Sequence, residues 1–167
     1  MQSNKFGHAV IKLAFFAAIL FTANQGIQIV IARSQFDAIV STIVGTNMGG
    51  DDYTSSNIRA NNRIFKKIGI KVDEAPDGSL VFETIWSENG ILFEPSTDNA
   101  GQSDGFSLPF VPTSTIVCDS ILSYGMPESY AVIRNYSKRI AENRELQSNV
   151  NVASACKNHP TLSFYFR

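Results

Sequence analysis

Runs of basic residues are missing from this 167-residue sequence. No stretch of Lys or Arg exceeds two in a row, and 14 basic against 15 acidic residues give a net charge of −1. A near-neutral chain without a basic cluster excludes nucleic acid or an anionic membrane surface as an obvious electrostatic partner. We therefore expect no nucleic-acid partner.

Motifs for catalysis and metal binding are also missing. The chain has only two histidines, His8 and His159, and neither lies in a pattern that pairs it with a nucleophile and an acid. His159 follows Cys156 by three residues, but no C-x-x-C pair supplies further ligands. The acidic stretch 98–104 fails the spacing of an EF-hand, and a hairpin loop is favoured there. We expect no enzyme, no catalytic residues, no cofactor and no metal.

Apolar residues, by contrast, are abundant. They make up 44% of the chain, which includes twelve Phe, and no internal repeat or low-complexity tract is evident. A chain of this length and composition predicts one folded domain with a substantial core.

Formal charge is absent over twenty consecutive residues, Leu13 to Ala32. A helix of that length, at 1.5 Å per residue, matches the hydrocarbon core of a bilayer. Four polar residues interrupt the run, so membrane residence is predicted to be marginal or transient. These are Thr22, Asn24, Gln25 and Gln28.

The N-terminus favours export. Lys5 and Lys12 precede the apolar stretch "LAFFAAILFTA", as the charged and apolar regions of an export signal do. Signal peptidase has no good site, because cleavage after Ala17, Ala18 or Ala23 would put a Phe at the −3 position. The apolar helix is therefore expected to survive export. A buried helix of a cytosolic protein is the alternative.

The helix is predicted to continue past Arg33. An apolar stripe follows at helical spacing, made of Phe36, Ile39, Val40, Ile43 and Val44. The two halves together predict one helix over 8–44, with Gly45 as the residue that ends it. The amphipathic second half would pack on a domain, while the first half, apolar on all sides, would project to bury itself elsewhere.

The remaining chain, 45–167, predicts a compact α+β head. One or two short helices are expected in 51–70 and another in 114–125, which ends at Gly125. Alternating or clustered β-branched and aromatic residues between turn residues predict antiparallel strands, the last of them half-buried. These strands are expected in 78–86, 89–95, 105–111, 128–137 and 161–167. Trp86 is interpreted as a core or sheet-edge aromatic, with a surface adhesive role as the alternative.

Several passages in this order resemble type IV pilins, and more closely the type IVb branch that includes thin-pilus pilins. They are the long N-terminal helix, "IVSTIVGTNMGGDDYTSSNI", "WSENGILFEP", "LPFVPTSTIVCDSIL" and "VASACKNHPTLSFYFR". The resemblance covers most of the chain. It implies a helical spine packed on an antiparallel sheet, with a disulfide-bounded C-terminal region.

The resemblance also implies a function. Pilin subunits are exported, held in the inner membrane, and then assembled into an extracellular pilus on a Gram-negative type of cell, with their apolar N-terminal helices buried together. Here the partners would be other pilin subunits, and the surface ligand is unknown. The residues implied in helix packing are Lys12, Leu13, Phe15, Phe16, Ile19, Leu20, Ile27 and Val30.

The processing motif departs from the family's pattern. Pilin precursors are cut after a Gly and carry a Glu at the fifth position of the mature chain. Gly7 is the candidate here, which would leave a leader of residues 1–7 and a mature chain that begins at His8. Lys12 then stands at the fifth position. This departure predicts a minor or divergent pilin, or a pilin-like protein that does not polymerise alone.

The two cysteines, Cys118 and Cys156, are interpreted in that setting. In an oxidising periplasm they are most simply paired, although two unpaired buried thiols remain an alternative. Two function classes stay open: a structural subunit of a type IVb-like filament, major or minor, and a secreted or membrane-tethered pilin-like binding or adhesion protein that does not polymerise.

Overall fold

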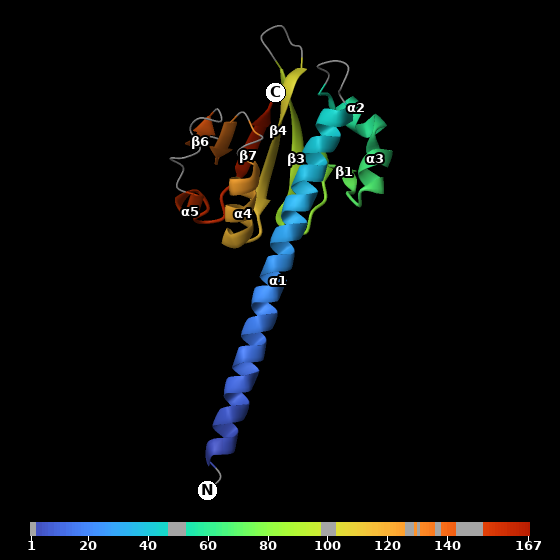
Figure 1. The fold of residues 1–167 in the computed structure, drawn as a ribbon. Helices are drawn as coiled ribbons and strands as arrows, with labels where there is room; N and C mark the ends of the chain where they lie inside the picture. Colours follow the sequence, from blue (N-terminus) through green and yellow to red (C-terminus); the bar gives the residue numbers. More distant parts are fainter. Residues whose placement is uncertain are drawn as a thin grey trace.

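A long helix and an antiparallel sheet dominate the computed structural model, which describes residues 3–46, 53–97, 103–125, 129, 131–135, 138–142 and 152–167. Helix α1, Ser3–Thr46, has 44 residues, and its side chains are described from Asn24 onward. Its C-terminal part lies against the sheet, and its N-terminal part extends away from the head (Figure 1). This is the predicted α+β architecture of a helical spine on an antiparallel sheet.

Helix α1 is longer than predicted at both ends. It begins at Ser3 rather than His8 and ends at Thr46 rather than Val44. Gly45 was predicted to terminate the helix, and that prediction is wrong, since Gly45 lies inside it. The Thr46 hydroxyl donates a 3.0 Å hydrogen bond to the Ile43 carbonyl, which supports this last turn.

The buried stripe of α1 is narrower than its sequence predicts. Ala32, Phe36, Ile39 and Ile43 are buried at helical spacing, and Val40 is partly buried. Val44 was predicted to share this stripe but is 39% exposed, because it lies at the margin of the face that meets the sheet.

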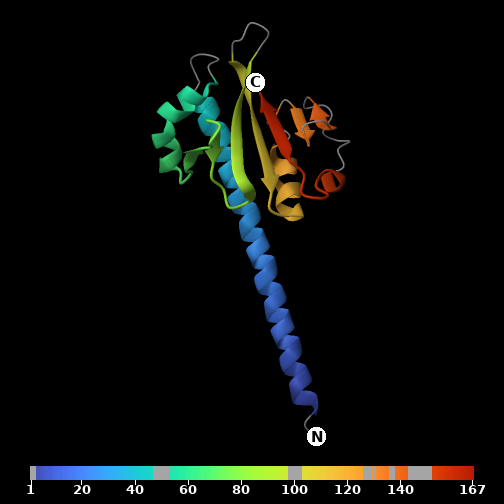
Figure 2. The same ribbon diagram turned by 180° about the vertical axis from the view of Figure 1, so that it is seen from behind.

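Seven antiparallel strands form one sheet in the order β1-β2-β3-β4-β7-β5-β6 (Figures 1 and 2). Their bounds are β1 Val72–Glu74, β2 Leu80–Phe82, β3 Ser87–Thr97, β4 Ser103–Pro112, β5 Ala131–Arg134, β6 Lys138–Glu142 and β7 Leu162–Phe166. The strand predicted for 78–86 is only three residues long. Strands β1 and β6 were not predicted, nor was helix α5, Val152–Ala155.

The last strand, β7, lies inside the sheet, with β4 on one side and β5 on the other. Leu162, Phe164 and Phe166 enter the core, as their alternation predicts. Ser163 is also buried, at 2% exposure, so the expectation of a half-buried strand is wrong. Being paired on both edges makes β7 an interior element.

Aromatic rings fill the space between α1 and the sheet. The Phe36 ring centroid lies 5.1 Å from that of Phe164, and the Trp86 centroid lies 5.3 Å from that of Phe110. Trp86 is 1% exposed, which confirms its interpretation as a core residue and contradicts the adhesive alternative. It lies between β2 and β3 rather than in a strand.

Three short helices of the described head lie where the sequence predicts helix. One or two short helices were predicted in 51–70, and the structure has two, α2, Ser55–Ala60, and α3, Asn62–Lys67. The Thr54 side chain accepts a hydrogen bond from the Asn57 amide at the start of α2. Helix α4, Thr115–Gly125, confirms the predicted helix, and its predicted end borders residues 126–128, which lie outside the described residues. The acidic stretch lies mainly outside the described residues, which resume with β4, but it joins two paired strands, β3 and β4.

Candidate functional site: the exposed arm of α1

The arm comprises residues 3–31 of α1, on the N-terminal side of Ala32, which is the first buried residue among the side chains of α1 that the structure describes. Ile27 is 58% exposed and Val30 is 67% exposed, whereas Ala32 is fully buried. A Cβ atom at Gly26 would meet no atom within 4 Å. Large apolar side chains exposed on a helix that leaves the domain identify a surface built to be covered by something else.

The base of the arm is fixed to the head by polar contacts. The Arg33 Nε donates a 2.8 Å hydrogen bond to the Ser120 hydroxyl on α4, and the guanidinium lies 5.7 Å from the centroid of the Tyr124 ring. Two residues further along α1, the Trp86 indole donates a 2.9 Å hydrogen bond to the Gln35 Oε1. These contacts set the direction in which the arm leaves the head.

Asn24–Thr46 is long and apolar enough to cross a membrane by length and composition alone, in a search limited to the described residues. Within this stretch, however, Phe36, Ile39 and Ile43 belong to the core of the head. A membrane-spanning segment of α1 therefore has to lie N-terminal to Ala32, which is where the sequence lacks formal charge.

The residues predicted to act in processing and packing all lie on the arm. Ile27 and Val30 point to solvent. Gly7 and His8 lie in the first turns of α1. The side chains of the remaining members lie outside the described residues, so their packing roles stay predictions; they are Lys12, Leu13, Phe15, Phe16, Ile19 and Leu20.

Cys118 on α4 and Cys156, which follows α5, form a disulfide with a Cα–Cα distance of 5.7 Å. The predicted pairing is confirmed, and the alternative of two unpaired thiols is wrong. Arg134 on β5 holds the same region by donating to the Ser154 and Lys157 carbonyls, at 3.2 and 2.5 Å. The C-terminal segment is thereby fastened to both α4 and the sheet.

Asp119 lies beside the disulfide. Its carboxylate and the two sulfur atoms are within 4.8 Å of one another, but sulfur atoms in a disulfide are not available as thiolate ligands. One carboxylate oxygen, Oδ1, is buried without a hydrogen-bond partner. Partial burial raises the pKa of Asp119 above its usual range.

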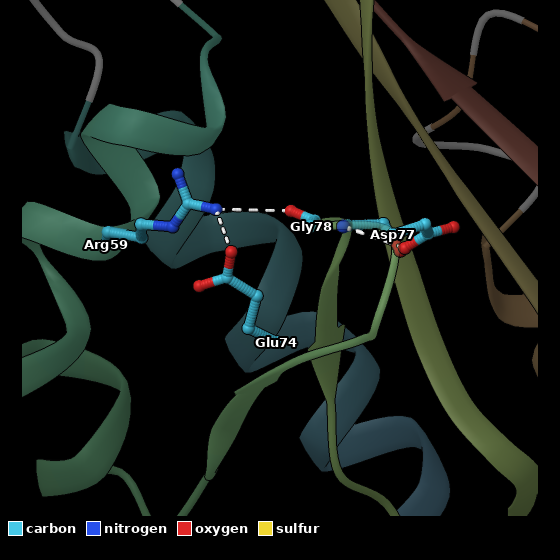
Figure 3. Close-up of polar contacts among 5 residues, drawn as sticks. Arg59, Glu74, Asp77 and Gly78 are labelled. Carbon is cyan, nitrogen blue, oxygen red and sulfur yellow. Dashed lines mark hydrogen bonds and ion pairs between the residues drawn. The ribbon is translucent and has the colours of Figure 1, made fainter.

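A second polar region lies at the β1–β2 edge of the sheet, where an open groove of about 580 Å³ is lined by several charged residues. Figure 3 shows Arg59 donating to Glu74, at 2.7 Å, and to the Gly78 carbonyl, at 3.1 Å. In the same groove, the Lys71 ammonium lies 2.6 Å from Asp73 and 2.9 Å from Glu83. Hydrogen bonds to these two acids raise the pKa of Lys71, and the bond from Lys71 lowers the pKa of Asp73. These groups are solvent-exposed and bonded to one another, as in a structural ion-pair network.

His159 is exposed, with its Nδ1 3.6 Å from the Glu88 Oε1. Within the described part of the chain, these contacts bring no nucleophile, base and acid together. Sequence reasoning missed the contact of Arg33 with Ser120 and Tyr124. One signal pointed to it, because Arg33 is the first charge after the uncharged run.

No protein-family model and no curated protein matches this sequence. The structure, however, is similar to the crystal structure of a type IVb pilin from Salmonella typhi, with a TM-score of 0.52 and 16% sequence identity. The match covers 81% of this chain and 97% of that one. This chain has a type IV pilin fold.

The pilin-like fold confirms the resemblance noted in the sequence, at the level of architecture.

Proposed function

We propose that this chain is a structural subunit of a type IVb-like pilus and that it assembles through its apolar N-terminal helix. The exposure of Ile27 and Val30 on a helix that is otherwise anchored in the head carries this proposal. An isolated subunit leaves this surface in water, whereas neighbouring arms in a filament would cover it.

The proposal includes the path of the subunit. The chain is exported, stays in the inner membrane through its arm, is cut after Gly7 so that His8 becomes its first residue, and then enters an extracellular filament. Its divisions would be the leader 1–7, the helix 8–44 and the head 45–167. Its partners are other pilin subunits, and it has no catalytic role.

The test is incorporation into filaments. The chain would be expressed together with a type IVb assembly machinery and its major pilin, and sheared filaments would be examined by immunogold electron microscopy. I27D places a charge on the arm, and I64D places one on the head at a similarly exposed isoleucine, since Ile27 and Ile64 are 58% and 41% exposed.

We expect I27D to abolish labelling of filaments and I64D to preserve it. Both heads should melt like the unmodified protein, because neither side chain belongs to the core. Incorporation of I27D at the unmodified level would refute assembly through the arm. Absence of the unmodified chain from filaments would favour the alternative, a membrane-tethered or secreted pilin-like binding protein that does not polymerise.

A further inference from the structure

The uncharged part of the arm ends where the head begins. Lys12 and Arg33 bracket the twenty uncharged residues, which as a helix are about 30 Å long and match a bilayer core. The residue just before Arg33, Ala32, is fully buried in the head. A bilayer that covers the uncharged run therefore has its surface at Arg33, with no length of helix left between the bilayer and the head.

Helix α4 lies beside α1 at the end of the head from which the arm leaves (Figures 1 and 2). Two large side chains of α4 are exposed, Ile116 at 39% and Tyr124 at 37%. They lie four residues before and four residues after Ser120, and therefore on the same face of α4 as the residue that Arg33 contacts. Tyr124 carries the Arg33 guanidinium over its ring, and Arg33 is held to α4 by Ser120. Arg33, Ile116 and Tyr124, which we call the seat, thus combine a cation, an aromatic ring and an aliphatic side chain.

This combination suits the headgroup layer of a phospholipid bilayer. Arginine has five N–H donors, and only the Nε–H of Arg33 is engaged, on Ser120, among its hydrogen bonds to described residues. The others can donate to phosphate oxygens. Tyrosine is enriched at membrane interfaces because its ring is apolar and its hydroxyl is polar. Because the arm already holds Arg33 at the bilayer surface, this single cation can bind a phosphate group without a surrounding basic cluster.

We propose that in the membrane-anchored subunit the head rests directly on the bilayer, with the seat in the phospholipid headgroup layer. The proposal rests on the membrane-anchored stage of the proposed function and adds a defined orientation to it. Helix α4 then faces the lipid. Helix α3, on the other side of α1, does not.

The test uses the full chain in phospholipid nanodiscs and quenching of tryptophan fluorescence by lipids brominated near the headgroup end of their chains. I116W places an indole on the seat, and I64W places one on α3 at nearly equal exposure, 39% against 41%. Trp86 is buried and supplies the same background in both variants. We expect quenching of the I116W indole and only background quenching for I64W.

R33Q combined with I116W tests the cation, and we expect this change to reduce the quenching. The Arg33 side chain is exposed, and a cooperative thermal melt of the variant would show that its head is folded. Unchanged quenching in R33Q would overturn the part assigned to Arg33.

Two other outcomes would overturn the seat and separate it from the proposed function. Equal quenching of I116W and I64W in protein that stays in the nanodisc means that the arm tethers the head without orienting it, and membrane anchoring then stands. Failure of the full chain to enter nanodiscs removes both the seat and the membrane-anchored stage.

Discussion

Two glycines on the same side of the head, Gly69 and Gly90, both adopt a left-handed backbone, with φ of 78° and 72°. Their surroundings differ. A Cβ at Gly69 would meet nothing within 4 Å, whereas a Cβ at Gly90 would lie 2.6 Å from the Val81 Cγ1 and 2.7 Å from the Phe82 carbonyl oxygen. Gly90 also lies where the register of β3 and β4 shifts.

This difference predicts unequal costs for the same substitution. G69A should lower the free energy of unfolding by about 1 kcal/mol, through the left-handed backbone alone. G90A should lower the free energy of unfolding by about 2–4 kcal/mol, because the backbone at residue 90 or strand β2 must also move. Urea denaturation of both variants measures the difference. Equal losses would show that the approach of β2 to Gly90 relaxes without cost.

Asp119 predicts a pH dependence. Its pKa in the folded protein is raised by burial, so between its unfolded pKa, near 3.8, and the folded value the folded state binds more protons than the unfolded state. Stability from this group is therefore greatest below that range and is lost as the pH rises through the folded pKa.

We expect D119N to remove this loss. The variant should have a higher melting temperature than the unmodified protein at pH 7 and should show no such gain at pH 3. Thermal melts at the two pH values measure it, with the disulfide kept oxidised. A gain of the same size at both pH values would assign the effect to packing rather than to ionisation.

At the scale of elements, helix α5 depends on the disulfide and on contacts with other elements for its order. Helix α5 has four residues, too few to be stable alone. It is held by the Cys118–Cys156 bond and by Arg134, while Asn135 and Thr161 exchange hydrogen bonds of 2.8 and 3.1 Å at the start of β7. The end of the chain is therefore ordered by its attachments.

Removing the disulfide should be costly. The bond closes a sequence separation of 38 residues, and the chain-entropy relation gives about 4 kcal/mol for a loop of that size. In urea denaturation, C118A/C156A should have a free energy of unfolding lower by about that amount. Reduction of the unmodified protein by a dithiol should lower its free energy of unfolding similarly. A loss below about 1 kcal/mol would mean that the polar attachments of α5 suffice without the bond.

The elements that the sequence predicts are those with a local signal. The 3.6-residue period marks the buried face of α1, and alternation marks β3, β4 and β7, because each pattern lies within one element. Strands β1 and β6 are short edge strands with no such pattern. The position of β7 between β4 and β5 depends on pairing with distant parts of the chain, which alternation does not report.

The candidate site also has a part that the sequence predicts and a part that it does not. The arm follows from its composition, since charge-free residues in a row are visible in the sequence. The residue at which the arm ends cannot be read from the sequence, because it depends on which residues of α1 the sheet covers. The Arg33–Ser120 contact joins residues 87 positions apart, and only the packing of α1 on α4 brings them together.

At the scale of the whole molecule, an assembled filament would place the arms of many copies in one apolar core. Lys12 lies on the arm, and cleavage after Gly7 would add a cationic α-amino group at His8, one turn away. An ammonium group in an apolar core costs several kcal/mol unless it is paired or neutralised. A polymer of this chain alone would repeat that contact between like charges at every step.

The subunit is therefore expected to be a minor component or to need an acidic partner, and K12E should raise its incorporation into filaments. The carboxylate would pair with the α-amino group of a neighbouring copy, whereas K12Q removes the charge without offering a partner and should give a smaller gain. Immunogold counts on sheared filaments compare the three chains, and expression with the assembly machinery but no other pilin tests the unmodified chain alone. Abundant filaments of the unmodified chain alone would reject the minor-subunit role and leave the structural one intact, because the like-charge contact would then have been relieved within the polymer itself.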